Sequence, residues 1–495
     1  MTTLDRRTVL KGAAAAGVAA FAGPFAGLLN APSVSAKPSF RSLRPVPDLR
    51  DQMVRLWLPE GFQYRSFHDT EPGAVTLTDG TRLPGRHDGM AAFPGPNGNV
   101  MLVRNHEVNG PGAAFGPGTP YDSMARGGTT TVEVTPDGHV VRSFTSLNGT
   151  QMNCSGGPTP WGTWITCEET VNGPDVGPDF TNVSNVPLVA PHGYIFEVPA
   201  DGQSSREPIT QAGRFPHEAV AVDPSTGTIY MTEDNFEIPS GFYRFIPDAN
   251  PMETGHLANA GRLQMLGVQG IGNADLAVTQ PMRATYHVEW VDIEDPNPTF
   301  PYTPGVTAPT SNDDAIAYVG AQGFAQGAAM FSRLEGAYYD NGVVYFTSTQ
   351  GGGPAEPTLK DEIQGWGNGW GQVWAYRIAA QTLQLIYQSP GPEVLDFPDN
   401  VTISPRGTII LCEDSGADNY IRGLSRGGQL FDIALNRLEW VTPPPAPPAT
   451  RPPNRYNDEF AGATFSPDGQ TLFVNIQASA GMTFAIWGPW HTLRV

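Results

Sequence analysis

The chain has 495 residues and a formal net charge of −20, with 49 Asp and Glu against 29 Lys and Arg. Gly (57) and Pro (48) are abundant and only 16% of the residues are charged, which predicts many turns and short strands with little helix. Such acidity disfavours nucleic acid as a partner, and it favours cations or substrates that are bound through cations.

The N-terminal residues 1–36 have the features of an export signal. The twin-arginine pattern is carried by Asp5-Arg6-Arg7-Thr8-Val9-Leu10-Lys11, and an Ala/Gly-rich apolar run follows it. Ser33-Val34-Ser35-Ala36 then offers a cleavage site. We therefore expect the twin-arginine export machinery as a partner, and a periplasmic or extracellular location.

The remaining chain is expected to hold one folded domain. Residues 37–52 contain prolines and are predicted to be a linker, and residues 53–495 are predicted to fold together. No apolar run beyond the signal approaches the roughly 18 residues that a membrane span needs. A monomer without a membrane span is the expectation.

Six segments of the chain share one pattern, in which a polar group, a strand, a turn glycine, a second strand and further polar residues follow one another. The segments are 87–107, 153–169, 217–234, 334–349, 398–414 and 459–477, with turn glycines Gly98, Gly162, Gly227, Gly342, Gly407 and Gly469. Irregular repeats of strand pairs predict an all-β fold, a six-bladed β-propeller with loop insertions. The strand near 62–67 is expected to complete the last blade beside 484–490, so that the ring has no free edge.

Polar side chains recur at both ends of these hairpins. The leading ends carry Asp88, Asn153, Cys154, Glu218, Glu335, Asp399, Asn400 and Glu459, and the trailing ends carry Arg104, Asn105, Glu168, Glu169, Glu233, Asp234, Ser348, Thr349, Glu413, Asp414 and Asn475. A hairpin places its first and last residues at the same end, so both sets should meet at one mouth of the propeller channel. Clustered carboxylates need bound cations, although Asp and Glu also serve as cap and turn residues.

The three cysteines divide into two kinds. Cys167 and Cys412 lie in apolar strands and are expected in the core. Cys154 lies in a polar, Gly-rich segment, where a thiolate ligand and a structural thiol are both open. Oxygen donors alone suit Ca²⁺, whereas an added thiolate indicates a transition metal such as iron.

Several motifs together resemble the PhoX family of secreted alkaline phosphatases. They are the twin-arginine signal, Arg104-Asn105-His106-Glu107, Asn153-Cys154-Ser155-Gly156-Gly157, Cys167-Glu168-Glu169, Pro216-His217-Glu218-Ala219, Arg333-Leu334-Glu335-Gly336, Pro398-Asp399-Asn400 and Glu459-Phe460-Ala461-Gly462. The resemblance implies a six-bladed propeller that holds ferric iron and calcium.

The resemblance also implies roles for individual residues. It implies that the iron ligands are Cys154, Glu169 and Glu218, and that Glu335 and Glu459 are mainly calcium ligands. It further implies that Arg333 holds the substrate phosphate with help from Asn105. Asp399 and Asp234 fit the expected geometry as further ligands.

Three functions follow as hypotheses. The first is a metal-dependent phosphoric monoester hydrolase acting on small extracellular phosphate esters. The second is a calcium-dependent propeller lactonase or esterase, which would need His106, His192 or His217 at the mouth. The third is a non-catalytic, calcium-binding secreted propeller. The combination of Cys154 with Arg333 favours the first, because neither alternative needs a thiolate ligand together with an anion-holding arginine.

Overall fold

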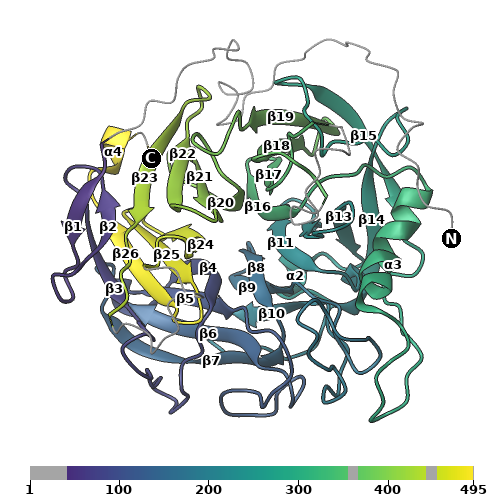
Figure 1. Cartoon of the computed structure of the whole chain (residues 1–495), viewed down its shortest axis with the longest axis horizontal. Helices are drawn as coiled ribbons and strands as arrows, with labels where there is room; N and C mark the ends of the chain where they lie inside the picture. The colour runs from purple at the N-terminus through teal and green to yellow at the C-terminus, as the bar shows by residue number, and fades with distance from the viewer. Residues whose placement is uncertain (1–41, 355–365, 442–453, 494) are drawn as a thin grey trace.

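Strands dominate the described residues, which in this computed structural model are 42–354, 366–441, 454–493 and 495. Figure 1 shows the sheets arranged around a common middle, in a β-propeller arrangement, so the prediction of an all-β propeller is confirmed. The expected export signal, 1–36, lies outside the described residues. Within the described ranges, no helix is both long and apolar enough to cross a membrane.

The described strands pair into five antiparallel sheets. In hydrogen-bonding order the first three are β4 (His87–Pro94), β5 (Val100–His106), β6 (Gly127–Val134) and β7 (Val140–Thr150); β8 (Asn153–Pro158), β9 (Thr163–Glu168) and β10 (Ile195–Pro199); and β11 (His217–Val222), β12 (Ile229–Glu233), β13 (Phe242–Pro247), β14 (Gly261–Val268), β15 (Thr285–Asp292), β19 (Thr382–Gln388), β18 (Gln372–Arg377), β17 (Val343–Ser348) and β16 (Leu334–Asp340).

The other two sheets contain strands from both ends of the chain. They are β1 (Arg44–Pro47), β2 (Val54–Leu58), β23 (Leu430–Asn436), β22 (Tyr420–Leu424), β21 (Ile409–Glu413) and β20 (Pro398–Ile403); and β24 (Glu459–Phe465), β25 (Thr471–Gln477), β26 (Met482–Trp487) and β3 (Gln63–Phe67). The helical elements are short apart from one, and comprise η2 (Pro96–Gly98), η3 (Thr210–Ala212), α2 (Pro251–Thr254), α3 (Asn312–Ala325) and α4 (Trp490–Leu493).

The nine-stranded sheet contains two of the six predicted hairpins, because β15 pairs with β19 and joins their sheets. Because two hairpins share one sheet, the described sheets do not divide into six separate blades, and the predicted count of six stays a prediction. The six inner strands β4, β8, β11, β16, β20 and β24 nevertheless contact one another in that order, and β24 contacts β4. We call the pairs β4–β5, β8–β9, β11–β12, β16–β17, β20–β21 and β24–β25 the inner hairpins.

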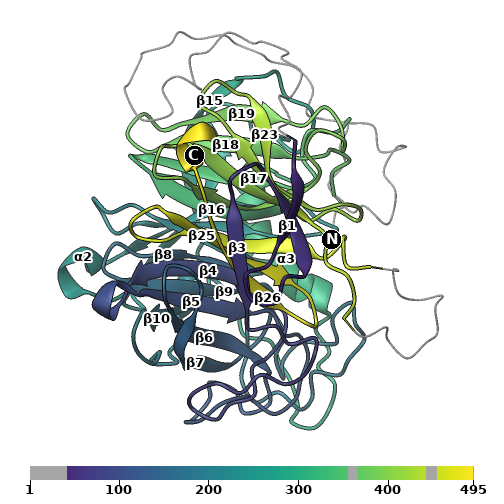
Figure 2. The same ribbon diagram turned by 90° about the vertical axis from the view of Figure 1, so that its left-hand side faces the viewer.

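The ring is closed by strands from opposite ends of the sequence. Strand β3 pairs with β26 in the register Phe67↔Thr483, as expected from the sequence, so the last sheet takes its outer strand from the N-terminal region. Figure 2 shows β3 beside β26, with β1 close by. Apolar side chains of neighbouring sheets pack between them, for example Ile410, Phe460 and Phe484 in one buried cluster.

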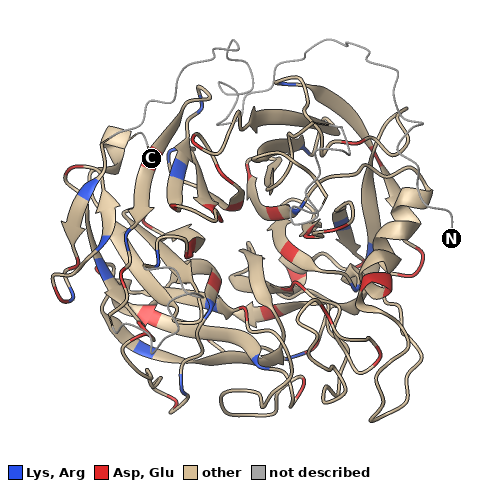
Figure 3. Cartoon of the chain, viewed as in Figure 1, with Lys and Arg blue, Asp and Glu red and all other residues tan. Residues whose placement is uncertain are grey.

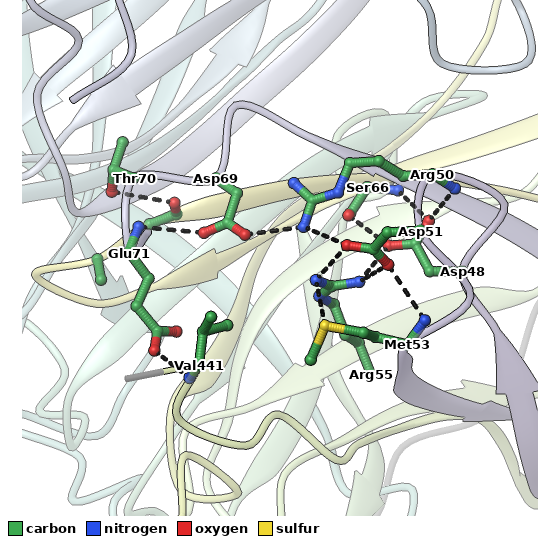
Figure 4. A network of polar contacts seen from close by, with 12 residues as sticks. Asp48, Arg50, Asp51, Met53, Arg55, Ser66, Asp69, Thr70, Glu71 and Val441 are labelled. Carbon is green, nitrogen blue, oxygen red and sulfur yellow. Dashed lines mark hydrogen bonds and ion pairs between the residues drawn. The ribbon is translucent and has the colours of Figure 1, made fainter. Parts of the chain in front are cut away.

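The linker prediction for 37–52 is wrong for its described part. Strand β1 pairs with β2, and the turn between them is fixed by the polar network of Figure 4. Asp48 accepts hydrogen bonds from the Ser66 amide (3.1 Å) and from Arg55 Nη1 (2.8 Å), and Arg50 Nη2 contacts Asp69 at 2.8 Å. The prolines of this segment favour a linker in the sequence, but β1 can contain them because it is an edge strand of its sheet.

Candidate metal centre

Each inner hairpin contains the same irregularity near its polar end. The register shifts between His87 and Met90 in β4, and the other inner strands shift between Asn153 and Gly156, His217 and Val220, Leu334 and Ala337, Pro398 and Val401, and Ala461 and Thr464. A β-bulge adds one residue to a strand and re-aims the side chains beside it. The repeated bulges therefore orient the residue that follows each shift.

That bulge residue is a metal-binding type in five of the six hairpins. The residues are Asp88, Cys154, Glu218, Glu335 and Asp399, while the sixth hairpin has Gly462 and contributes Glu459 instead. The strands must also approach closely, since a Cβ on Gly336 would lie 2.6 Å from the Val401 nitrogen. Gly336, directly after Glu335, therefore lets its strand approach the neighbouring inner strand closely.

A second set of side chains comes from the residue just after each partner strand. In five hairpins its N–H donates to the carbonyl of the residue two positions before the bulge residue, over 2.9 to 3.2 Å. The donors are Glu107, Glu169, Asp234, Thr349 and Asp414. Four of these five equivalent positions are acidic, so the channel mouth carries two levels of carboxylates. Figure 3 shows Asp and Glu concentrated on the strands around the middle of the ring.

The five bulge residues of metal-binding type and the four acids of the second set line a single cavity of about 1540 Å³. Of the predicted residues it contains Cys154, Glu169, Glu218, Asp234, Arg333, Glu335, Asp399 and Glu459. Loop residues, including Phe180, Phe236 and Trp440, also line it. The structure thus brings together every predicted site residue except Asn105.

Seven of the lining residues form three overlapping groups of possible ligands. Within each group the candidate ligand atoms lie within 4.8 Å of one another; the groups are Cys154, Glu169 and Glu218; Glu218, Glu335 and Asp399; and Asp399, Asp414 and Glu459. Glu218 and Asp399 each belong to two groups. The donors therefore form a continuous row that could hold several adjacent ions.

The electrostatics of this row favour bound cations. Burial, together with neighbouring carboxylates, raises the pKa of Glu218 and Glu335 well above the usual range of a glutamate. Burial and the nearby Asp414 raise the pKa of Asp399 to about 7. Burial, reinforced by Glu218 and Glu169, also raises the pKa of the Cys154 thiol. A multivalent cation would remove this repulsion and favour the ionised forms.

The thiolate and the carboxylates fit the metals implied by the family resemblance. Sulfur beside two carboxylates suits iron, whereas the groups with oxygen donors alone suit calcium. Because the donor set matches, these residues can be assigned as the ones that would hold such ions.

At three hairpin ends two acids follow one another in the sequence, and the two acids of each pair have different roles. Glu168, Glu233 and Glu413 point away from the cavity and accept hydrogen bonds from amides of their own sheet region, such as Gly193 N (2.9 Å) and Gly241 N (2.8 Å). Successive side chains at a strand end face opposite directions, so the following acid faces the cavity. This alternation selects Glu169, Asp234 and Asp414.

Arg333 is held firmly at the edge of the row. Its Nη2 lies 2.9 Å from Asp234 and 2.7 Å from Glu335, and its side chain is only 16% exposed. The prediction that Arg333 and Glu335 enter the same mouth is confirmed. Asp234 belongs to none of the three ligand groups formed by described residues and pairs with Arg333, so its role as a metal ligand stays a prediction.

The structure does not bring Asn105 into the cavity, and its predicted catalytic role stays a prediction. Its Nδ2 donates to the carbonyls of Cys154 (2.9 Å) and Ser155 (2.7 Å), and its Oδ1 accepts from Trp164 and Thr166. These four bonds satisfy the side chain completely, and it does not line the cavity. Asn105 is a positioning residue that fixes the backbone of the cysteine-bearing bulge.

Three cavity acids at the ends of the inner hairpins have no role assigned from the sequence, namely Asp88, Glu107 and Asp414. Asp88 and Asp414 are among the polar residues at the ends of the predicted hairpins, and the backbone hydrogen bond shared by the second set identifies Asp414 as a cavity residue. Glu107 was not identified because its hairpin has a longer turn and a longer second strand than the β16–β17 hairpin. Strand β5 starts two residues after Gly98, whereas β17 starts one residue after Gly342, and β5 is one residue longer than β17. The offset of seven residues that reaches Glu169 and Asp414 reaches Asn105 in this hairpin.

The three histidines required by the lactonase hypothesis lie elsewhere. His106, His192 and His217 are fully buried, and none is among the residues that line the cavity. His192 Nδ1 contacts Glu168 at 2.6 Å. Burial lowers the pKa of His192, but the Glu168 and Asp122 carboxylates more than offset this and raise it to about 9.

Comparisons with known proteins agree with this architecture. The family model described as alkaline phosphatase PhoX matches residues 40–141 and 136–480. The structure of Pseudomonas fluorescens PhoX in complex with vanadate, a transition state analogue, is similar with a TM-score of 0.61 and 17% identity, covering 91% of this chain and 98% of that chain.

A second solved structure shows weaker similarity. The gluconolactonase XC5397 from Xanthomonas campestris has a TM-score of 0.40 and 12% identity, covering 91% of this chain and 100% of that chain. No curated protein sequence matches the chain.

Proposed function

The chain belongs to the PhoX family of alkaline phosphatases. From this premise we propose that it is a metal-dependent phosphatase that hydrolyses small extracellular phosphate esters after twin-arginine export. The observation that carries the proposal is the combination in one cavity of three overlapping ligand groups with the ion-paired Arg333 at their edge.

The residues divide by donor type. Cys154, Glu169 and Glu218 would hold ferric iron, because they supply the sulfur donor. Glu335, Asp399, Asp414 and Glu459 would hold calcium together with the shared Glu218. When bound, these ions would polarise the phosphoryl group and supply positive charge to a chain of net charge −20.

Arg333 would orient the phosphate dianion. Its hydrogen bonds to Asp234 come from Nε and Nη2, so the plane of the guanidinium is fixed before substrate binds. A planar fork donates two hydrogen bonds to a phosphate, which a lysine ammonium cannot reproduce. Asp234 and Glu335 therefore act as positioning residues for the group that binds the substrate.

The two alternative functions receive less support. A lactonase of the type considered needs a histidine at the mouth, and the three candidates are buried away from the cavity. A structural calcium propeller does not need the Cys154 thiol beside two carboxylates or an arginine held at the ligand row. We also propose that the six inner hairpins represent six blades, two of them joined by β15–β19, and that the protein acts as a monomer.

The proposal is tested with the natively exported protein. We expect it to contain iron and calcium by elemental analysis and to hydrolyse p-nitrophenyl phosphate until a chelator removes the calcium. R333K should lower kcat/KM about tenfold or more, while its metal content and Tm stay near those of the parent. A parent without phosphatase activity when fully metal-loaded would refute the function, and an R333K variant as active as the parent would refute the role of Arg333.

A further inference from the structure

A second arginine occupies the same place in its hairpin as Arg333. Arg86-His87-Asp88-Gly89 and Arg333-Leu334-Glu335-Gly336 both place an arginine two residues before the bulge acid and a glycine after it. Both arginines have positive φ angles, 47° for Arg86 and 41° for Arg333. Both carbonyls also accept the equivalent backbone hydrogen bond, at 3.0 Å and 2.9 Å.

The side chains are held in the same manner. Arg86 contacts the Glu107 carboxylate through Nε (3.1 Å) and Nη2, as Arg333 contacts Asp234. Among the described residues, neither Nη1 atom forms a hydrogen bond, and the Arg86 side chain is 41% exposed against 16% for Arg333. Each cation therefore keeps donor capacity on a guanidinium that a carboxylate has already oriented.

The two arginines lie on opposite sides of one cavity. Strands β4 and β16 are separated by two inner strands in either direction around the ring, and both arginines line the cavity. Arg86 interacts electrostatically with Asp88 and Glu459, whereas Arg333 lies beside Asp234 and Glu335. The part of the ligand row from Glu335 to Glu459 thus extends between two arginines that are each held by a carboxylate.

We propose that Arg86 forms a second anion-binding subsite, which receives a carboxylate or phosphate carried by the leaving group of the substrate. This inference rests on the proposed phosphatase function, because it assigns the scissile phosphate to the Arg333 side. Glu107, Asp88 and Glu459 lie near Arg86, so a substrate with two anionic groups would be repelled by these carboxylates without a cation. The substrates selected are therefore phosphate esters with a second anionic group.

The test uses substrate pairs that differ in one anionic group. Glycerol 3-phosphate and 3-phosphoglycerate differ by a carboxylate, and the monophosphate and bisphosphate of 1,3-propanediol differ by a phosphate. For each pair we take the kcat/KM of the substrate with two anionic groups divided by the kcat/KM of the substrate with one. In R86Q this ratio should fall about tenfold or more. R86K should retain part of the ratio, because it keeps the charge but loses the planar fork. R82Q, which changes a nearby exposed arginine outside the cavity, should keep the parental ratio.

The outcomes separate this inference from the proposed function. An unchanged ratio in an R86Q protein that still hydrolyses glycerol 3-phosphate would overturn the subsite alone. If the parent hydrolyses neither ester, the proposed function fails, and calorimetric titration of the metal-loaded parent and R86Q with the same pairs decides the subsite. Equal losses of affinity for both members of a pair would then overturn it. If R86Q does not fold, the ratio in R86K gives the same decision.

Discussion

Replacing Asp399 with asparagine should change stability in opposite directions with and without metal. Asp399 belongs to two ligand groups, and its pKa is raised from 3.8 to about 7 by burial and by Asp414. An acid whose pKa is higher in the folded state loses stability as pH rises from about 4 to 7, and the loss persists above that range. About three pKa units correspond to about 4 kcal/mol at pH 8 in the metal-free protein.

D399N removes this penalty and keeps an oxygen that can accept the 2.7 Å hydrogen bond from Asn400. With an unfolding entropy of about 1 kcal/mol per kelvin for a chain of this size, the metal-free Tm should rise by about 4 °C. With calcium present the Tm should fall by about 1 °C, because Asp399 belongs to two ligand groups and a hundredfold weaker affinity at both sites loses about 5.4 kcal/mol of stabilisation, more than the gain of about 4 kcal/mol.

The assay is differential scanning calorimetry at pH 8, with excess calcium and after exhaustive chelation. D201N is the control, since Asp201 is exposed on a turn and does not line the cavity. Its Tm should match that of the parent in both conditions. A D399N variant that lowers the metal-free Tm would show that carboxylate repulsion does not destabilise the empty row.

Three further predictions concern residues around the cavity. C154S should lose most of its iron by elemental analysis, whereas C167S and C412S should retain it, because only the first thiol lines the cavity; equal iron in all three would remove Cys154 from the ligand set. The stability of the parent should fall by up to about 3 kcal/mol between pH 6.5 and 9, because a histidine with a raised pKa loses its charge over that range; H192Q should abolish this dependence in denaturant titrations. N105A should lower stability by about 1–3 kcal/mol and reduce the iron content, with kcat per bound iron near the parental value; a normal iron content with lost turnover would support a catalytic role.

The alignment on turn glycines was sufficient to find the inner hairpins and most of the ligand row. It worked because strand length, turn and polar ends are encoded locally, and each hairpin repeats them. It could not show which of two consecutive acids faces the channel, because a single added bulge residue reverses the direction of the side chains beside it. Asn105 was selected in place of Glu107 because of the longer turn and strand of that hairpin.

Long-range pairings were less accessible. Nothing local to Thr382–Gln388 indicates that this strand would pair with β15 and join two sheets. The Arg333–Asp234 pair likewise joins two hairpins, so this contact could not be predicted from either segment alone. The strand at 44–47 was missed because its prolines are compatible with an edge strand as well as with a linker.

The pairing of β3 with β26 has a consequence for biosynthesis. Strand β26 lies far from β3 in the sequence, and Glu459, on the same sheet, can join Asp399 and Asp414 only when that sheet is in place. A growing chain therefore carries an incomplete, repulsive acidic row throughout synthesis, and joining such distant strands is slow. The third ligand group should therefore bind calcium only after residue 459 has been synthesised, so a nascent chain stalled before residue 459 should retain less calcium than the whole chain even in a calcium-rich compartment.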